Sequence, residues 1–419
     1  MPLDRRQVLA AATAALSVAP VQGHPAEAEP EPSNPLTDWR TIARQYEVTR
    51  DITNLENGNW GIMSRPVLKQ YLSFTELVNK NNSYYARRQY DGDAARVTAR
   101  IAQSLGVEAH EIALTRNATE ALQSLIAGYN KLTPGDAVLY ADLDYDSMQT
   151  AMQWLRVRRG VRVEQISLPE PASYQSVIDA YDRALQPSRG IRLVLLTHLS
   201  HRTGLIMPVR EIASLARERG ADVVLDAAHA WGQIELDLRD LPVDFAGVNL
   251  HKWIGAPIGV GALYIRAERI RDIDPFMGQA GPGSPISQRV HTGTVNMAAV
   301  LTVPAALDFH ERIGASNKER RLRALRDRWV HPLLGRPGIE ILTPEDPRMY
   351  AGITSFRMSG RTSAAENVEI ARQLAERYRI FTVARDGVAK GSCIRVTPGF
   401  YTQTGDMDKL AAALGQMLA

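Results

Sequence analysis

The chain is poor in cysteine, in net charge and in long hydrophobic runs, and each of these shortages excludes or disfavours a class of protein. Its one cysteine, Cys393, excludes an intramolecular disulfide. A net charge of +3 over 419 residues, with basic residues scattered along helix faces such as 318–328, disfavours a nucleic-acid partner. No G-x-G-x-x-G motif follows an early strand, which excludes a Rossmann dehydrogenase. A hydrophobic content of 45% instead indicates a globular protein large enough for a main domain and a smaller one.

The first residues are typical of an export signal. Arg5 and Arg6 precede an alanine-rich apolar segment that is too short and too weakly hydrophobic to serve as a membrane anchor. We predict a twin-arginine signal peptide over residues 1–28, read by the twin-arginine export machinery, and a linker with an N-terminal arm over residues 29–50. An amphipathic N-terminal helix is the alternative. We therefore expect a periplasmic location, which suits a chain with one cysteine. The twin-arginine route carries folded proteins, so the protein can be exported with a ligand already bound.

Two short apolar runs deliver polar side chains at their carboxyl ends. The run DVVL is typical of a buried parallel strand and is followed by Asp226 and His229; the run FAGVNL is followed by His251 and Lys252. Open α/β sheets bind their ligands at this edge. An acid, two histidines and a lysine suit pyridoxal phosphate, which needs a lysine to hold its aldehyde as a Schiff base and a carboxylate to keep its pyridine nitrogen protonated.

The motifs D-A-A-H-A-x-G, N-x-H-K-W and G-x-G-x-L-Y-I follow one another in this part of the chain. Their order and spacing resemble class V aminotransferases of the pyridoxal-phosphate fold type I, most closely the branch of isopenicillin N epimerase and its relatives. The resemblance runs from about Asn54 to the C-terminus. It implies an α/β fold with a large, mainly parallel-sheet domain that binds the cofactor, residues 51–310, and a smaller α+β C-terminal domain, residues 311–419.

The resemblance assigns roles around the cofactor ring. Lys252 would form the Schiff base and move the proton, Asp226 would pair with the pyridine nitrogen, and His229 would reach the phenolic oxygen or the Schiff base. Tyr145 would stack on the ring, because a flat aromatic face suits an electron-poor heterocycle. Ser200, with the histidine that follows it, would lie near the phenolic oxygen.

The phosphate is expected at the start of a helix near residue 118. Ala118 and Thr119 belong to its first turn, where free backbone N–H groups and the helix dipole favour an anion; simple N-capping is the alternative. By the resemblance, His251 lies beside the phosphate. In the family a Gly-Thr pair crosses to the phosphate of a second subunit, so Gly293 and Thr294 predict a homodimer.

Three further residues are candidates for binding the substrate. A segment similar to the one with Asn57 and Trp60 lines the substrate side of the cofactor in the family; ordinary loop packing is the alternative. Arg395 matches the arginine that grips the substrate α-carboxylate through a bidentate pair. Its alternative is a surface arginine on a strand. No metal site is predicted.

The sequence leaves the reaction open. An aminotransferase acting on an amino acid or a peptide-borne amine comes first, because no dedicated second acid is evident. An epimerase of the isopenicillin N type, or a periplasmic enzyme that tailors peptide siderophores of the pyoverdine kind, is the alternative. A cysteine desulfurase or lyase is disfavoured because Cys393 stands two residues from Arg395. A catalytically inactive cofactor-binding protein is disfavoured because Lys252 and Asp226 are both present.

Overall fold

A computed structural model of the chain describes residues 36, 38–278, 280–281, 283–291 and 293–419. The predicted signal peptide, residues 1–28, and the first part of the predicted linker therefore lie outside the described residues. No helix in the described part is long and apolar enough to cross a membrane.

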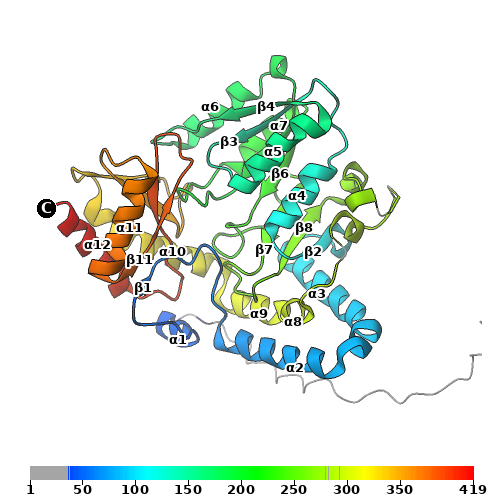
Figure 1. Cartoon of the computed structure of the whole chain (residues 1–419), viewed down its shortest axis with the longest axis horizontal. Coiled ribbons are helices and arrows are strands. Elements are labelled where there is room, and N and C mark those ends of the chain that lie inside the picture. Colours follow the sequence, from blue (N-terminus) through cyan, green and yellow to red (C-terminus); the bar gives the residue numbers. More distant parts are fainter. Residues whose placement is uncertain (1–35, 37, 279, 282, 292) are drawn as a thin grey trace, which may run out of the picture. The chain divides into compact units, whose positions relative to one another are not determined.

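A seven-stranded sheet forms the centre of the larger part of the structure (Figure 1). Its strand order is β2-β8-β7-β6-β5-β3-β4; β8 runs antiparallel to both neighbours, and the pairs from β7 to β4 are parallel. The predicted α/β fold with a mainly parallel sheet is thereby confirmed. The strands are β2 (Ile112–Thr115), β3 (Ala137–Ala141), β4 (Arg162–Ile166), β5 (Ile191–Thr197), β6 (Asp222–Asp226), β7 (Phe245–Asn249) and β8 (Gly261–Ile265).

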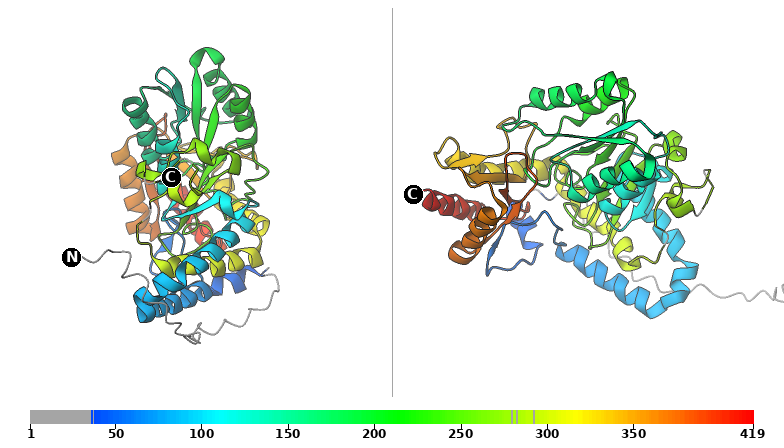
Figure 2. Two further views of the ribbon diagram at one scale, coloured as in Figure 1. Left: turned by 90° about the vertical axis from the view of Figure 1, so that its right-hand side faces the viewer. Right: turned by 45° about the horizontal axis from the view of Figure 1, so that its top comes forward.

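The central strands are buried on both faces, which explains their continuous apolar runs. In β3, residues 138 and 140 enter one hydrophobic core, and residues 137, 139 and 141 enter another. Helices cover both faces of the sheet (Figure 2). The helices that pack into the first core are α4 (Ala118–Gly128) and α5 (Asp146–Arg159); those that pack into the second include α6 (Tyr174–Ala184) and α7 (Val209–Glu218).

Further helices surround the sheet and lead to the C-terminal part. They are α1 (Trp39–Arg44), α2 (Arg65–Arg88), α3 (Tyr90–Ser104), α8 (Met297–Leu301), α9 (Val303–Ile313) and α10 (Ala315–Val330). Helices α8, α9 and α10 follow one another closely along the chain. They are separated at Thr302, two residues before Pro304, which cannot donate a helical hydrogen bond, and at Gly314, whose φ is 85°. Short 3₁₀ helices lie at Ala109–Glu111, Pro187–Arg189, Ala267–Asp272, Phe276–Gly278, Ile286–Arg289 and His331–Leu333.

The C-terminal part is a second, antiparallel sheet with the order β12-β13-β10-β9. Its elements are β9 (Ile339–Ile341), β10 (Thr354–Met358), β12 (Val383–Arg385), β13 (Cys393–Val396), α11 (Ala364–Tyr378) and α12 (Thr404–Met417). This agrees with the expected α+β arrangement; the division at residue 310 stays a prediction. Two short strands follow α11 along the chain: β11 (Ile380–Phe381) pairs in parallel with β1 (Thr53–Asn54), and β12 joins the small sheet.

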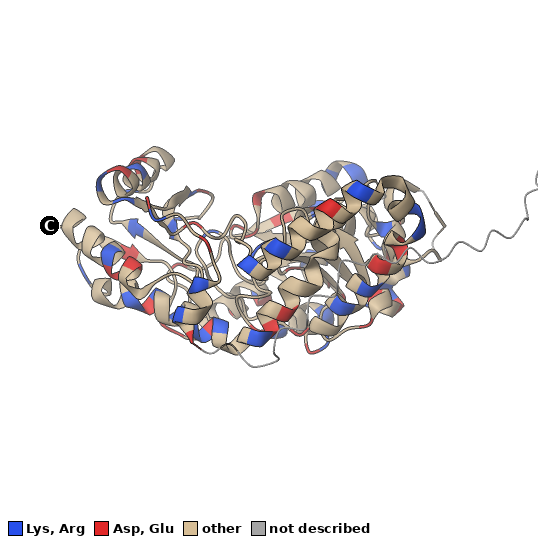
Figure 3. Ribbon diagram, turned by 90° about the horizontal axis from the view of Figure 1, so that it is seen from below, with Lys and Arg blue, Asp and Glu red and all other residues tan. Residues whose placement is uncertain are grey.

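Charges of both signs are mixed along the helices. Figure 3 shows blue and red positions interspersed on the face seen there, without a continuous stretch of one sign. This mixing accords with the small net charge of the chain.

Candidate active site

A cavity of about 320 Å³ opens at the carboxyl ends of the parallel strands. Asp226 ends β6, and Lys252 follows β7 by three residues, so neighbouring strands bring both to one place. This is the sheet edge where open α/β folds bind ligands. The predicted residues that line the cavity together are Ala118, Thr119, Tyr145, Asp226, His229, His251, Lys252 and Arg395.

Lys252 and His229 form the centre of the cavity. The Lys252 Nζ lies 2.9 Å from the His229 Nε2, and the Trp253 indole N–H donates to the His229 Nδ1 at 3.3 Å. Because Nδ1 accepts, a neutral His229 carries its proton on Nε2 and donates it toward the lysine nitrogen. Burial lowers the pKa of Lys252 to about 8 and the pKa of His229 well below its usual value. The fraction of Lys252 in the neutral, nucleophilic form is therefore larger than that of an ordinary lysine.

Asp226 is a buried carboxylate whose partners in the described chain are few. Its Oδ1 accepts from the Ala228 backbone N–H at 2.9 Å, and its side chain makes no ion pair with the described residues. Burial raises the pKa of Asp226 despite that hydrogen bond and the attraction of Lys252. A buried acid in a cavity wall needs a positively charged or N–H partner, which is what a protonated pyridine nitrogen provides.

The other end of the cavity meets the start of α4. The Asn117 side chain caps this helix by accepting from the Glu120 N–H at 2.8 Å, and the Asn249 Oδ1 accepts from the Ala118 N–H at 2.8 Å. A Cβ added to Gly261 would lie 2.7 Å from the Asn117 backbone, so only glycine lets β8 pack this closely. The first turn of α4 lines the cavity at Ala118 and Thr119. Because the Ala118 N–H is already bound by Asn249, Thr119 and the helix dipole are what this turn offers an anion.

His251, the residue before Lys252, lines the same cavity as this helix start. Its Nδ1–H donates to the Val260 carbonyl oxygen at 3.0 Å, which holds the ring in place. Burial lowers the pKa of His251 to about 4, so the ring is neutral near pH 7. The start of α4 with His251 beside it suits the phosphate of pyridoxal phosphate, Asp226 suits its pyridine nitrogen, and Lys252 suits its aldehyde.

His201, rather than Ser200, lines the cavity. Ser200 is fully buried, and its hydroxyl donates to the Leu143 carbonyl oxygen at 3.3 Å and accepts from the Arg202 N–H at 3.2 Å. In the turn that follows β5, the serine hydroxyl is therefore bound to nearby backbone, and the histidine side chain faces the cavity. The His201 ring packs edge-on against Tyr145 at 5.1 Å between centroids and stacks toward His229 at 6.5 Å.

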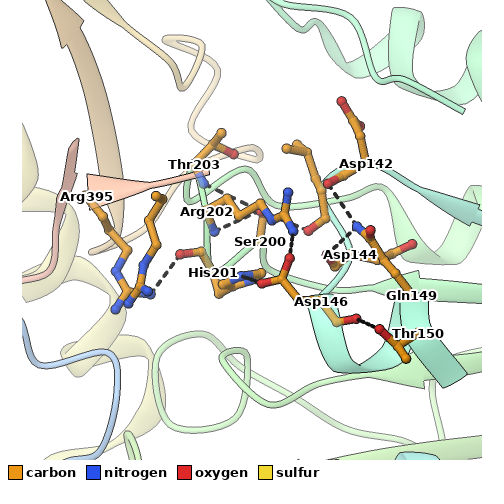
Figure 4. A network of polar contacts seen from close by, with 12 residues as sticks. Asp142, Asp144, Asp146, Gln149, Thr150, Ser200, His201, Arg202, Thr203 and Arg395 are labelled. Atoms are coloured by element: carbon orange, nitrogen blue, oxygen red, sulfur yellow. Dashed lines mark hydrogen bonds and ion pairs between the residues drawn. The ribbon is translucent and has the colours of Figure 1, made fainter. Parts of the chain in front are cut away.

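Behind His201 lies a polar network that the sequence did not reveal (Figure 4). The Asp146 carboxylate pairs with the buried Arg202 and lies 3.8 Å from the His201 Nε2. Nearby, the buried Asp144 accepts from the Thr197 N–H at 3.0 Å, and burial raises its pKa to about 7. These contacts join the loop after β3 to the turn after β5, segments about 56 residues apart, so no local pattern reports them.

The expected substrate residues divide between this cavity and a neighbouring one. The neighbouring cavity has a volume of about 740 Å³ and shares Asn59, Ile258 and Arg385 with the first. Asn57 and Trp60 line the neighbouring cavity. The Asn57 side chain is held there, because its Nδ2 donates to the Thr397 carbonyl oxygen at 2.9 Å and its Oδ1 accepts from the Tyr401 hydroxyl at 2.8 Å.

Gly293 and Thr294 are exposed and do not line either cavity. They lie in the loop before α8, where the Gly293 N–H donates to the His291 Nδ1 at 2.9 Å. The homodimer expected from them stays a prediction. Within the described residues, no group of three or more His, Cys, Asp and Glu side chains could hold a metal ion.

Comparison with known proteins places these features in one family. The model of the aminotransferase class-V family matches residues 63–410. Isopenicillin N epimerase of Streptomyces clavuligerus is 28% identical over 90% of this chain and 98% of its own length, and that of Amycolatopsis lactamdurans is 28% identical over 91% and 99%.

Solved structures agree in fold. Cysteine desulfurase from Thermococcus onnurineus NA1 superposes with a TM-score of 0.79 at 20% identity, covering 90% of this chain and 98% of that one. A C-DES mutant with glycine covalently linked to its PLP cofactor gives 0.77 at 22% identity, covering 88% and 98%. The family match and the residues of the cavity lead to one conclusion: the chain belongs to the aminotransferase class-V family of pyridoxal-phosphate enzymes.

Proposed function

We propose that the protein is an aminotransferase that acts on an amino acid or a peptide-borne amine, with the cofactor attached to Lys252. When bound, pyridoxal phosphate supplies an aldehyde that captures amines and a ring that withdraws electrons from the substrate. The observation that carries the proposal is the contact between the Lys252 Nζ and the His229 Nε2 at 2.9 Å, inside a cavity that also holds Asp226.

Lys252 is the base of the proposed reaction. Its pKa, lowered to about 8 by burial, lies near the working pH, where a group can both take and return a proton. His229 supports the neutral amine by donating from Nε2, and Trp253 fixes the tautomer that makes this possible. Transamination needs a single base that would take a proton from the amine-bearing carbon of the substrate and would deliver it, on the same side, to the carbon that carries the aldehyde of the free cofactor.

Epimerisation is the second candidate. The isopenicillin N epimerases match nearly their whole length to this chain, and His201 and Tyr145 add a second pair of titratable groups to the cavity wall. However, burial lowers the pKa of His201 to about 4, which leaves it a neutral ring and a weak proton donor near pH 7. This favours the one-base reaction over delivery of a proton from the opposite face.

The experiment is incubation of the holoenzyme with candidate amino acids in heavy water, without an added keto acid. We expect up to one equivalent of keto product per subunit and no deuterated amino acid of inverted configuration. Catalytic formation of such an inverted, deuterated amino acid would replace transamination by epimerisation. The matched variant is Lys252→Ala, which should lose the covalent cofactor adduct that borohydride otherwise traps.

The neighbouring cavity supports a substrate larger than a free amino acid. Three exposed apolar side chains, Trp60, Ile258 and Phe381, line it, at 53%, 60% and 41% exposure. Exposed apolar side chains gathered around a pocket are typical of ligand-binding surfaces. A peptide-borne amine, including one carried on a siderophore of the pyoverdine kind, could reach Lys252 from this side while its body rests in the neighbouring cavity.

The chemistry of Cys393 argues against a cysteine desulfurase. Its thiol is fully buried in β13, 3.8 Å from the Arg202 carbonyl oxygen, and burial raises its pKa to about 11. A nucleophilic cysteine needs the opposite environment, exposed and electropositive. The presence of both Lys252 and Asp226 in the cavity likewise argues against an inactive binding protein.

Export by the twin-arginine route to the periplasm, and assembly as a homodimer, are part of the proposal. The support for export is the Arg5–Arg6 pair before an alanine-rich segment. Cell fractionation of the full chain, compared with a variant that carries lysines in place of Arg5 and Arg6, tests it. Retention of the wild-type chain in the cytoplasm would refute the export.

A further inference from the structure

Two arginines of the small sheet share one carboxylate from the N-terminal segment. Arg395, in β13, is 1% exposed; its Nη1 donates to the His201 carbonyl oxygen at 2.8 Å and its Nη2 donates to the Glu56 Oε1. Arg385, in β12, points its Nη2 at the same Glu56 oxygen from 3.4 Å. The arginine expected to grip a substrate carboxylate thus already holds a carboxylate of its own chain.

The three side chains stand where the two cavities meet. Arg395 lines the cavity of Lys252, Glu56 lines the neighbouring cavity, and Arg385 lines both. The backbone after Glu56 lies close to these side chains: a Cβ added to Gly58 would lie 3.1 Å from the Arg395 Cζ and Nη2. Backbone therefore packs against the guanidinium plane, and the contact is a formed part of the cavity wall.

The group retains hydrogen-bonding capacity for a ligand. Among the described residues, the Glu56 Oε2, the Arg395 Nε and the Arg385 Nε are buried and have no partner. Arginine offers five N–H donors, and Arg395 uses two of them in the contacts above. Buried polar groups are normally paired, so this group, which also lines both cavities, has capacity for a further partner such as a ligand or an ordered water.

The charge of the group limits what that acceptor can be. Two guanidinium groups and one carboxylate leave a single net positive charge, which one further carboxylate neutralises. A second anionic group at the same place would have no compensating charge beside the buried Arg395 and Glu56.

We propose that Glu56 determines the charge selectivity of the substrate site: it holds Arg395 and Arg385 as a receptor for one carboxylate and disfavours substrates with a second anionic group there. The substrate class is an amine with one carboxylate next to the reacting carbon and an uncharged neighbouring portion. This inference rests on the proposed function, since it concerns the same cavity.

The test is binding of unreactive carboxylates to the cofactor-loaded enzyme by titration calorimetry. Butanoate and glutarate serve as probes, because they have no amine and differ by one carboxylate. We expect wild-type protein to prefer butanoate. Glu56→Gln should lower the dissociation constant of glutarate relative to that of butanoate by about tenfold or more, because it removes a charge that repels the second carboxylate at close range.

Three controls separate the charge of Glu56 from general disturbance. Glu56→Asp keeps the charge and should keep the preference for butanoate. Asp51→Asn removes an exposed charge from the same segment, outside both cavities, and should change neither constant. Arg385→Gln, on the half-exposed edge of the group, should weaken binding of both probes at least about tenfold, and it remains informative where Glu56→Gln fails to fold.

An unchanged ratio in Glu56→Gln would overturn the inference and make Glu56 a structural partner of Arg395. Absence of saturable butanoate binding to loaded wild-type enzyme would overturn it as well. Both outcomes are distinct from failure of the proposed function, which would appear in the heavy-water incubation as an inverted, deuterated amino acid, or before it as a protein that does not load its cofactor on Lys252.

Discussion

Gly61 is where the N-terminal segment contacts the turn that carries the catalytic lysine, and its replacement by alanine is the most direct test of that contact. The Gly61 N–H donates to the His251 carbonyl oxygen at 2.7 Å. A Cβ added to Gly61 would lie 1.9 Å from the Lys252 carbonyl oxygen, whereas real Cβ atoms essentially never come closer than 3.0 Å to such an atom. Both partners are backbone atoms, so no side chain can rotate to relieve the overlap.

The expected cost follows from these distances. Relief requires the two backbones to separate by about 1 Å, which breaks the hydrogen bond, worth about 1 kcal/mol, and adds overpacking of about 1–3 kcal/mol. A displacement of about 1 Å at a catalytic group can lower the rate about 100-fold. We therefore expect Gly61→Ala to lose about 2–4 kcal/mol of stability and on the order of 100-fold in turnover.

The assay is the single-turnover rate of the loaded enzyme with the best amino acid of a panel, measured beside the thermal midpoint of unfolding. Gly405→Ala is the matched control, because nothing lies within 4 Å of its added Cβ and it belongs to helix α12. It should be neutral or slightly stabilising. A Gly61→Ala protein with a rate within twofold of wild type would refute the claim that this segment holds Lys252 in place.

Three further outcomes are expected. Asp226→Asn should fold but lose most of its turnover, because an amide does not stabilise a protonated pyridine nitrogen; near-normal kinetics would show that the acid only supports structure. Light scattering should find a homodimer that a bulky Thr294→Arg substitution weakens, and an active, loaded monomer would contradict this. Burial lowers the pKa of Lys318 to about 7, so the unfolded chain binds more protons than the folded one between that value and 10.5, and stability should rise with pH across this window. The melting temperature of wild type, minus that of Lys318→Met, should therefore increase between pH 7 and 9.5. A difference that does not change with pH would refute a lowered pKa of Lys318.

Local signals made much of the reaction site predictable. The run DVVL is apolar because β6 is buried on both faces, so the position of Asp226 at its end follows directly. The start of α4 was readable because Asn117 is a capping residue followed by helix formers. In these places propensity, burial and function agree along a few consecutive residues.

Contacts between distant segments were not readable in the same way. Glu56 and Arg395 are separated by 339 positions, and nothing in the extended segment around Glu56 reports its partner. The residues near 380 have strand character, but the pattern does not tell which sheet each residue joins. The choice between Ser200 and His201 depends on a turn in which the Gly204 N–H donates to the Ser200 carbonyl oxygen, a geometry set by packing against β10.

The pairing of β1 with β11 affects when the protein can become active during its synthesis. Thr53 pairs with Ile380, and Glu56 forms an isolated bridge with Thr397. The N-terminal segment that lines both cavities is therefore held by C-terminal residues, which are synthesised last. A ribosome has nearly finished the chain before this segment has its partners. The large sheet can fold earlier, but the substrate site cannot be complete on a nascent chain that ends before Ile380.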